Sequence, residues 1–382
     1  MFVVAFGTNV PTPLLLVYQD LLGLSANALT GAFGVYAAGL VPALLLAGPA
    51  SDRFGRRPVV LPFVVLSVVT SLLFLGASGS VVLLFVCRFL QGAVSGVVFS
   101  VGTAWLAELI GEPARAARLA TAALGGGWAI GPLVAGLMGQ WLPLPTVLPY
   151  LVHVALMLVG LALLPRVPET HVPAATERRD GPLVNLGVPP GSRLPFLVVV
   201  LPVAVGVFTF PSTAVTVLPL LLTPSMPQIA VAITGLVAGV TLLTGVFAQP
   251  LGRTLGAVTA GPTGLVVGAA GFGLSLVSVA TGWWPLLVPV AVLLGIGYGL
   301  CLAAGLTLVG ELASPAARGA LTGTFYACAY LGFGVPLLLS VAGGDAGFAV
   351  PLAALALTSA GFAALLALPA ARRLVTPAPA AA

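Results

Sequence analysis

The chain has 382 residues, of which 59% are hydrophobic and only 6% are charged. A soluble domain carries about 25% charged residues, so this composition excludes a soluble globular protein and predicts an integral membrane protein. The net charge of +5 is scattered over short polar segments, which argues against a nucleic-acid partner.

Twelve apolar segments follow one another along the chain, most of them long enough to cross a bilayer as helices. Their limits are 1–18, 27–48, 58–77, 81–107, 119–140, 147–165, 195–222, 229–251, 262–281, 285–309, 320–342 and 349–369. We therefore predict an all-α membrane protein with twelve transmembrane helices. The first segment is short for a span. We therefore expect that the true N-terminus lies upstream of Met1 or that the first helix is truncated.

The arginines orient these helices. All 14 cationic side chains are arginines, and all but Arg88 are cytoplasmic if the first connection lies outside. Cytoplasmic loops of membrane proteins are enriched in arginine and lysine, so both termini are predicted to lie in the cytoplasm. We expect the protein to reside in the plasma membrane.

The longest connection, residues 166–194, is polar and rich in proline and glycine, and we interpret it as a cytoplasmic linker. It separates an N-terminal six-helix bundle, 1–165, from a C-terminal one, 195–369. Residues 370–382 are predicted to form a disordered cytoplasmic tail.

The two halves repeat each other, which is typical of transporters. Sequence matches recur at a spacing of 203 or 204 residues. They pair Thr30, Gly31 and Gly48 with Thr234, Gly235 and Gly252, Gly92, Gly96 and Gly102 with Gly295, Gly299 and Gly305, and Glu108 and Arg115 with Glu311 and Arg318. In this alignment Gly256 replaces Asp52 and Ala291 replaces Arg88, so the charges were kept only in the first half.

One polar stretch stands out, running from Gly48 through Asp52, Arg53, Gly55, Arg56 and Arg57 to Pro58. We expect it to form a short cytoplasmic loop between segments two and three. Its order of glycines, acid and arginines resembles the loop between helices two and three of the major facilitator superfamily. That resemblance implies two pseudo-symmetric six-helix bundles that rock about a central substrate site, with no cofactor.

Charges at the cytoplasmic helix ends are the candidate gate. The resemblance implies that they pair while the cytoplasmic side is closed, whereas ordinary solvated helix ends are the alternative. The set comprises Gly48, Asp52, Arg53, Gly55, Arg56, Arg57, Glu108, Arg115, Glu311 and Arg318. We assign the gate pairs themselves to Asp52, Arg53, Arg57, Glu108 and Arg115.

Arg88 lies inside segment four, followed by Gln91 and Gly92. An arginine in hydrocarbon costs at least about 2.5–3.5 kcal/mol, so it needs a partner or a cavity. It can bind backbone carbonyls and fix helix packing, or it can face a cavity and take part in coupling. The order R-x-x-Q-G resembles the fourth-helix motif that the superfamily links to proton coupling, and we favour that role.

Segment five contains Gly127, Gly131, Pro132 and Gly136. The spacing G-x-x-x-G indicates a packing face, and the proline a bend. The stretch also resembles the fifth-helix motif of the superfamily's antiporters, especially drug–proton exchangers.

No acid lies in the middle of any span, although proton-coupled exporters of the superfamily often use one. His153 is the one histidine inside a segment, and we interpret it as a structural residue rather than a proton carrier. The substrate cavity implied by the resemblance is mildly polar and aromatic. We place in it Asn9, Thr12, Ser95, Trp128, Phe208, Phe210, Ser212, Tyr298, Tyr326 and Tyr330.

These observations predict a secondary transporter, similar to the twelve-helix drug:H⁺ antiporters, that exports small amphipathic compounds by alternating access. We expect protons to be the coupling ion and the protein to be a monomer in the bilayer. A facilitator or symporter of a sugar or organic anion is the first alternative. A membrane receptor without transport is the second. No metal-ligand cluster or catalytic triad is present in the sequence, so an enzyme is not expected.

Overall fold

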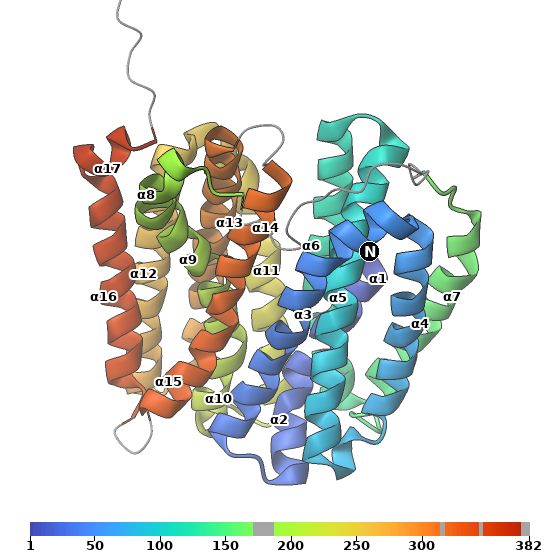
Figure 1. Ribbon diagram of the computed structural model, residues 1–382. Coiled ribbons are helices and arrows are strands. Elements are labelled where there is room, and N and C mark those ends of the chain that lie inside the picture. Colours follow the sequence, from blue (N-terminus) through green and yellow to red (C-terminus); the bar gives the residue numbers. More distant parts are fainter. Residues whose placement is uncertain (171–186, 314–317, 344–346, 376–382) are drawn as a thin grey trace, which may run out of the picture. The chain divides into compact units, whose positions relative to one another are not determined.

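The computed structural model describes residues 1–170, 187–313, 318–343 and 347–375, and every regular element in these ranges is helical (Figure 1). Twelve spans in them are long and apolar enough to cross a membrane. The polar backbone groups of a chain in hydrocarbon must bond to one another, and helices satisfy them within each segment. The predicted fold class is confirmed.

The structure divides into two compact units, Met1–Val184 with Pro227–Gly239, and Asn185–Met226 with Val240–Ala382. The first unit holds six spans. They are α1 (Phe2–Asn9) with α2 (Pro11–Leu22), α3 (Ala26–Phe54), α4 (Arg56–Phe74), α5 (Val81–Ile110), α6 (Pro113–Trp141) and α7 (Leu148–Leu163). The first ten residues of α11 also pack in this unit.

The second unit contains the other spans, several of them built from more than one helical piece. They are α8 (Arg193–Pro195) to α10 (Leu218–Leu222) with α9 (Leu201–Ser212) between them, α11 (Ala230–Leu255), α12 (Ala257–Thr281), α13 (Leu287–Leu312), α14 (Arg318–Tyr330) with α15 (Val335–Gly343), and α16 (Ala349–Ala367). The short α17 (Pro369–Arg373) follows.

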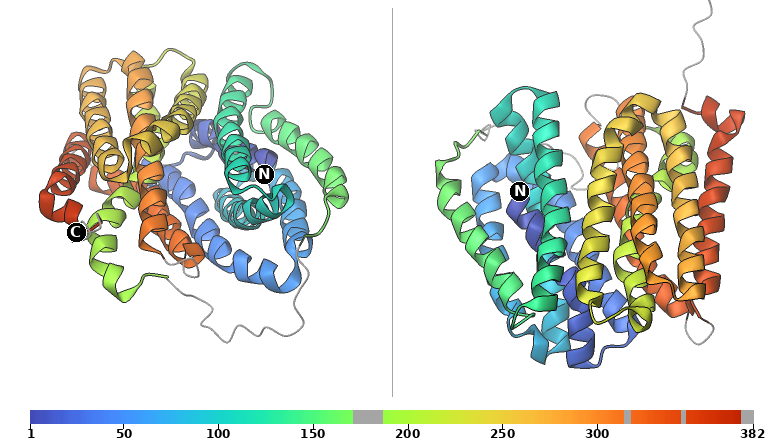
Figure 2. Two further views of the ribbon diagram at one scale, coloured as in Figure 1. Left: turned by 90° about the horizontal axis from the view of Figure 1, so that it is seen from above. Right: turned by 180° about the vertical axis from the view of Figure 1, so that it is seen from behind.

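Burial separates inner spans from outer ones. Within an 18-residue apolar stretch of each span, 72% of the residues are buried in Phe2–Leu22 and in Arg193–Ser225, 67% in Trp284–Leu312 and 56% in Val81–Ile110. By contrast α7 and α16 lie at the edges of their units, and the corresponding shares in their spans are 22% and 17% (Figures 1 and 2). The first, fourth, seventh and tenth spans are therefore the most buried of the twelve described spans.

The stretch expected to be a loop is mostly helix. Helix α3 continues through Gly48 and Asp52 to Phe54, and α4 begins at Arg56. Gly55 alone makes the turn, with φ of 96°, a value that favours glycine. Helix α3 continues where its side chains become polar, because polar side chains do not by themselves end a helix. Within its last turns the Ser51 hydroxyl donates to the Gly48 carbonyl.

Glycines set the contact between the second and fourth spans of each repeat. A Cβ on Gly96 would lie 2.5 Å from the Leu40 carbonyl oxygen, and one on Gly295 would lie 2.5 Å from that of Thr241. Gly92 meets Tyr36 in the same way, as Gly299 meets Gly245. Helices can approach this closely only where no side chain intervenes.

These contacts correct the repeat alignment. Gly92 and Gly295 are 203 residues apart, as expected, but their partners Tyr36 and Thr241 are 205 apart rather than 204. The counterpart of Gly256 is the turn residue Gly55, since both adopt positive φ between two helices. The prediction that Gly256 replaces Asp52 is therefore wrong.

The second unit lacks a helical turn here. Gly55 follows Leu40 by 15 residues, whereas Gly256 follows Gly245 by 11. The difference of four residues is about one turn of α-helix. Helix α3 thus ends in an additional turn, Ser51–Phe54, which contains Asp52.

Candidate functional site

Arg56 joins three helices of the first unit, α3, α4 and α5. It is the first residue of α4, and only 7% of its surface is exposed. Its guanidinium lies 2.7 Å from an Asp52 carboxylate oxygen on α3 and 2.6 Å from one of Glu108 on α5. It also donates to the Ser51 hydroxyl. A buried arginine between two carboxylates forms charge-assisted bonds stronger than an exposed ion pair.

The segment Val167–Thr170 lies across this cluster, and we call it the strap. The Glu169 carboxylate accepts hydrogen bonds from the backbone N–H groups of Arg56, at 3.1 Å, and Arg57, at 2.7 Å. It caps α4, whose N-cap residue, Gly55, has no side chain to do so.

Further contacts hold the strap in place. The Trp105 indole donates to the Pro168 carbonyl at 3.0 Å, and the Thr170 hydroxyl donates to Glu108. Arg57 donates from its side chain to the Val167 carbonyl. In the sequence, the strap is indicated only by Glu169, an acid in the linker, and by the resemblance of Pro168, Glu169 and Thr170 to the acidic segment after helix six in sugar porters.

The structure assigns the central role in the cluster to Arg56, whereas the sequence interpretation gave it to Arg53 and Arg57. The Arg53 guanidinium lies over the Phe54 ring, 5.2 Å from its centroid. Arg115 is exposed at the start of α6, and Glu311 is exposed near the end of α13. The side chain of Arg318 lies outside the described residues. Gly48 has no atom within 4 Å of the place a Cβ would take.

Arg88 is 1% exposed and binds backbone carbonyls of two neighbouring helices. Its guanidinium donates to the carbonyls of Ala32, Phe33 and Thr8 at 3.1–3.3 Å. It also lies 5.0 Å from the centroid of the Tyr36 ring, a favourable cation–π distance. This geometry fits the alternative in which Arg88 binds backbone carbonyls and fixes helix packing. The arginine connects α1, α3 and α5.

Gln91 extends the Arg88 network to α1. Its carboxamide oxygen accepts from Arg88 at 2.7 Å, and its amide donates to the Gly7 carbonyl at 2.6 Å. One turn on, the hydroxyls of Ser95 and Thr8 are 2.9 Å apart. Ser95 is fully buried within the first unit.

Helix α6 uses its glycines for packing. Cβ atoms on Gly127 and Gly131 would collide with backbone atoms of Phe2 and Phe6 on α1. A Cβ on Gly136 would lie 2.9 Å from Gly235 on α11, next to Pro132, whose carbonyl faces Gly235. The fifth-helix motif thus provides close contacts on two faces.

At the start of α2, two predicted cavity residues contact each other and α6. The Asn9 amide donates to the Trp128 carbonyl at 3.3 Å, and the Thr12 hydroxyl donates to Asn9 at 3.5 Å. The Trp128 ring packs edge-on against Phe99, with centroids 5.4 Å apart.

An aromatic cluster in the second unit brings together three of the predicted cavity residues. The Phe208 ring stacks on Tyr330 with centroids 4.6 Å apart and lies 6.1 Å from the ring of Tyr298. Phe333 completes the cluster, 5.0 Å from Phe208. The rings come from α9, α13 and the break between α14 and α15. Tyr326, one turn before Tyr330, is half-buried against Phe325.

Phe210 and Ser212 do not join this cluster. Phe210 is fully buried against Phe272 of α12, 5.7 Å away. The Ser212 hydroxyl donates to the Gly332 carbonyl at 2.9 Å, which ties α9 to the break that follows α14. Both therefore serve helix packing in this structure.

The sequence profile of the Major Facilitator Superfamily matches residues 1–256, which is more than half of the chain. The chain belongs to this superfamily. Among the described residues no group of histidine, cysteine or acidic side chains could hold a metal ion. Members of the superfamily carry small molecules across membranes, so the chain is a transporter and not an enzyme.

Relatives within the superfamily include the multidrug resistance protein MdtL of two bacteria. The Klebsiella pneumoniae (strain 342) protein is 40% identical over 124 residues, 32% of this chain and 31% of that protein. The Shewanella oneidensis protein is 32% identical over 158 residues, 40% of this chain and 39% of that protein. These matches thus span less than half the length of the curated relatives.

Two solved transporter structures show the same fold over nearly the whole chain. A crystal structure of the peptide transporter POT has a TM-score of 0.82 and 16% identity, covering 98% of this chain and 94% of that one. The nucleoside transporter NupG has a TM-score of 0.70 and 15% identity, covering 98% of each chain. At this identity the likeness concerns the fold alone.

Proposed function

We propose that this transporter exports small amphipathic compounds, including drugs, in exchange for protons. The observation that carries the substrate class is the aromatic cluster of Phe208, Tyr298, Tyr330 and Phe333. Stacked rings offer flat apolar surfaces, and the tyrosines add polar edges. Such a surface suits aromatic and amphipathic ligands better than sugars, which need many hydrogen-bonding groups.

The name of the MdtL relatives supports the same class, because it refers to multidrug resistance. The MdtL proteins match only part of this chain, so we propose export and proton coupling for it. We further propose a monomer in the plasma membrane with both termini in the cytoplasm.

The cytoplasmic cluster is the proposed gate. Arg56 bonds to acids on two other helices, so any movement of α3 or α5 away from α4 must break a charge-assisted bond. Glu169 adds two bonds to the same corner. We propose that these bonds are present when the cytoplasmic side of the transporter is closed and are broken when it opens.

A liposome assay tests the proposal. Purified protein is reconstituted with an entrapped pH dye and an imposed pH gradient, and tetraphenylphosphonium, chloramphenicol, glucose and lactate are added separately. We expect the amphipathic compounds to dissipate the gradient and the other two to leave it unchanged. Compound flux without proton movement would instead indicate a facilitator.

A sugar or organic-anion carrier is the second candidate, favoured by one observation. The strap residues Pro168, Glu169 and Thr170 resemble the acidic segment after helix six in sugar porters, and Glu169 contacts the cytoplasmic cluster. A response to glucose or lactate in the same assay would favour this candidate.

A further inference from the structure

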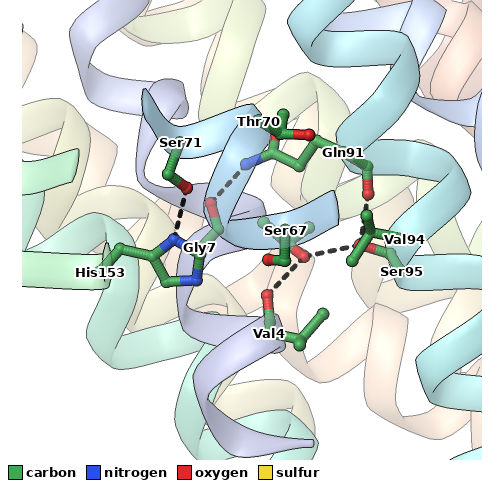
Figure 3. Close-up of a pocket in the computed structure, with 10 residues that line it drawn as sticks. Val4, Gly7, Ser67, Thr70, Ser71, Gln91, Val94, Ser95 and His153 are labelled. Atoms are coloured by element: carbon green, nitrogen blue, oxygen red, sulfur yellow. Dashed lines mark hydrogen bonds between the residues drawn. The ribbon is translucent and has the colours of Figure 1, made fainter. Parts of the chain in front are cut away.

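A small polar cavity lies inside the first unit, among α1, α4, α5 and α7. It measures about 10 Å³, room for the centre of one water molecule. Its wall includes Gly7, Ser67, Ser71, Gln91, Ser95 and His153 (Figure 3). Burying polar groups in an apolar bundle is costly, so such a concentration of them is a candidate functional site.

His153 is the titratable group of this cavity. Its side chain is 3% exposed, and both ring nitrogens are hydrogen-bonded. Nε2 lies 3.1 Å from the Val3 carbonyl oxygen, which can only accept, so Nε2 carries a hydrogen. Nδ1 lies 2.7 Å from the Ser71 hydroxyl and accepts its hydrogen in the neutral ring (Figure 3).

We propose that His153 binds the coupling proton at Nδ1, within this cavity, and that Gly7 transmits its charge state to helix α1. The inference rests on the proposed function, because it assigns a residue to the proton step. Among the described spans, no carboxylate lies near the middle of a helix, whereas His153 does lie inside one.

The hydrogen bonds allow the proton to be taken up without breaking the arrangement. The Nδ1 lone pair accepts the proton, and the new N–H donates to the Ser71 oxygen. The Ser71 hydroxyl hydrogen then turns from Nδ1 towards the cavity. Ser67, one helical turn earlier on α4, is 5% exposed and lines the same cavity, so we assign its hydroxyl oxygen as the acceptor of that hydrogen.

Gly7 connects the ring to the transport machinery. A Cβ on Gly7 would collide with the imidazole of His153, so ring and backbone are in direct contact. The Gly7 carbonyl accepts from Gln91 at 2.6 Å, and Gln91 accepts from Arg88. Helix α1 ends two residues later, at Asn9, and α2 begins at Pro11. A change at His153 therefore reaches a break in the first span.

The charges around His153 are few. Helix α1 presents a backbone carbonyl and the Phe6 ring, and α4 presents only hydroxyls. On α5, Arg88 is the charged group of the linked network, and on α7 itself Tyr150 is bonded to Tyr18 of α2. A second positive charge is thus opposed by Arg88, which makes proton binding sensitive to that network.

The test uses the full-length protein in the liposome assay with the compound that wild type transports. His153→Gln keeps a polar side chain that cannot bind a proton near neutral pH. We expect it to retain exchange of labelled for unlabelled compound without a gradient, and to lose compound-driven proton movement by tenfold or more. Proton movement at the wild-type level in His153→Gln would overturn the inference and leave the proposed function intact. A wild type that moves compound without protons would overturn both.

Ser71→Ala decides the matter if His153→Gln fails to fold. It leaves the ring in place and removes the partner of Nδ1, so we expect the pH at half-maximal proton-coupled transport to shift by at least half a unit. Thr70→Ala on the same helix is the matched control, because the Thr70 hydroxyl donates to the Leu66 carbonyl and not to the ring. An unchanged pH profile for Ser71→Ala would overturn the inference.

Discussion

Substitution of Gly92 by alanine tests whether this residue of the fourth span serves helix packing or proton coupling. A Cβ at this position would lie 2.9 Å from the Tyr36 carbonyl carbon and 3.0 Å from the Leu40 nitrogen, with the Tyr36 oxygen closer still. Carbon atoms pack at about 3.5–4.0 Å, so Gly92→Ala must push α3 and α5 apart. These are backbone atoms of a continuous helix, and no side chain can rotate to relieve the clash.

Overpacking of this kind costs about 1–3 kcal/mol. For a unit of this size, each kcal/mol lowers the melting temperature by about 2–4 °C. We therefore expect Gly92→Ala to melt about 2–12 °C below wild type in detergent. A thiol-reactive dye measures this, because Cys87 and Cys301 are fully buried and react only after unfolding.

Gly48→Ala is the matched control. It lies on α3, and nothing stands within 4 Å of the added methyl group. Its melting temperature should equal or exceed that of wild type, since alanine favours helix over glycine by about 1 kcal/mol. A Gly92→Ala protein that melts with wild type but loses proton coupling would refute the packing argument and assign Gly92 to coupling.

Four further variants probe the other sites. Glu169→Ala removes the cap of α4, and we expect a stability loss of about 1 kcal/mol by the same dye assay; no loss would mean that the strap contributes nothing to stability. Phe208→Ala should weaken binding of an aromatic substrate about two- to tenfold, measured by equilibrium binding, whereas Phe210→Ala should lower only the melting temperature; equal effects would contradict separate roles. Arg88→Ala should abolish proton movement in liposomes while the protein still folds, and normal coupled export would argue for packing alone.

The number and order of spans could be predicted from sequence because hydrocarbon demands long apolar helices. Their ends could not be predicted equally well. The charged stretch Gly48–Phe54 suggested a loop, yet it forms about the last two turns of helix α3. Charge reveals where a segment leaves the membrane but not whether its backbone stays helical. The single turn residue, Gly55, is recognisable only from its positive φ.

Partners across helices were the least predictable feature. Adjacent positions on a helix point about 100° apart, so the choice of Arg56 over Arg57 as the centre of the cluster depends on helix rotation. The contact between His153 and Gly7 joins residues far apart in sequence, and no local pattern signals it. Likewise Phe208 and Phe210, two residues apart on α9, face different neighbours: Tyr330 in one case and Phe272 in the other.

The two repeats have diverged in a way that separates their tasks. In the first, an additional turn of α3 carries Asp52 to the Arg56 cluster, and Arg88 occupies the position where the second has the buried Ala291. In the second repeat, the apolar Ala291 stands in place of Arg88. The distinctive feature of that repeat is the aromatic cluster around Phe208. Since Ala291 packs without a charge, the fold itself does not require an arginine there. We therefore expect substitutions in α1, α4, α5 and α7 to alter pH dependence, and substitutions in α9, α13 and α14 to alter which compounds are transported.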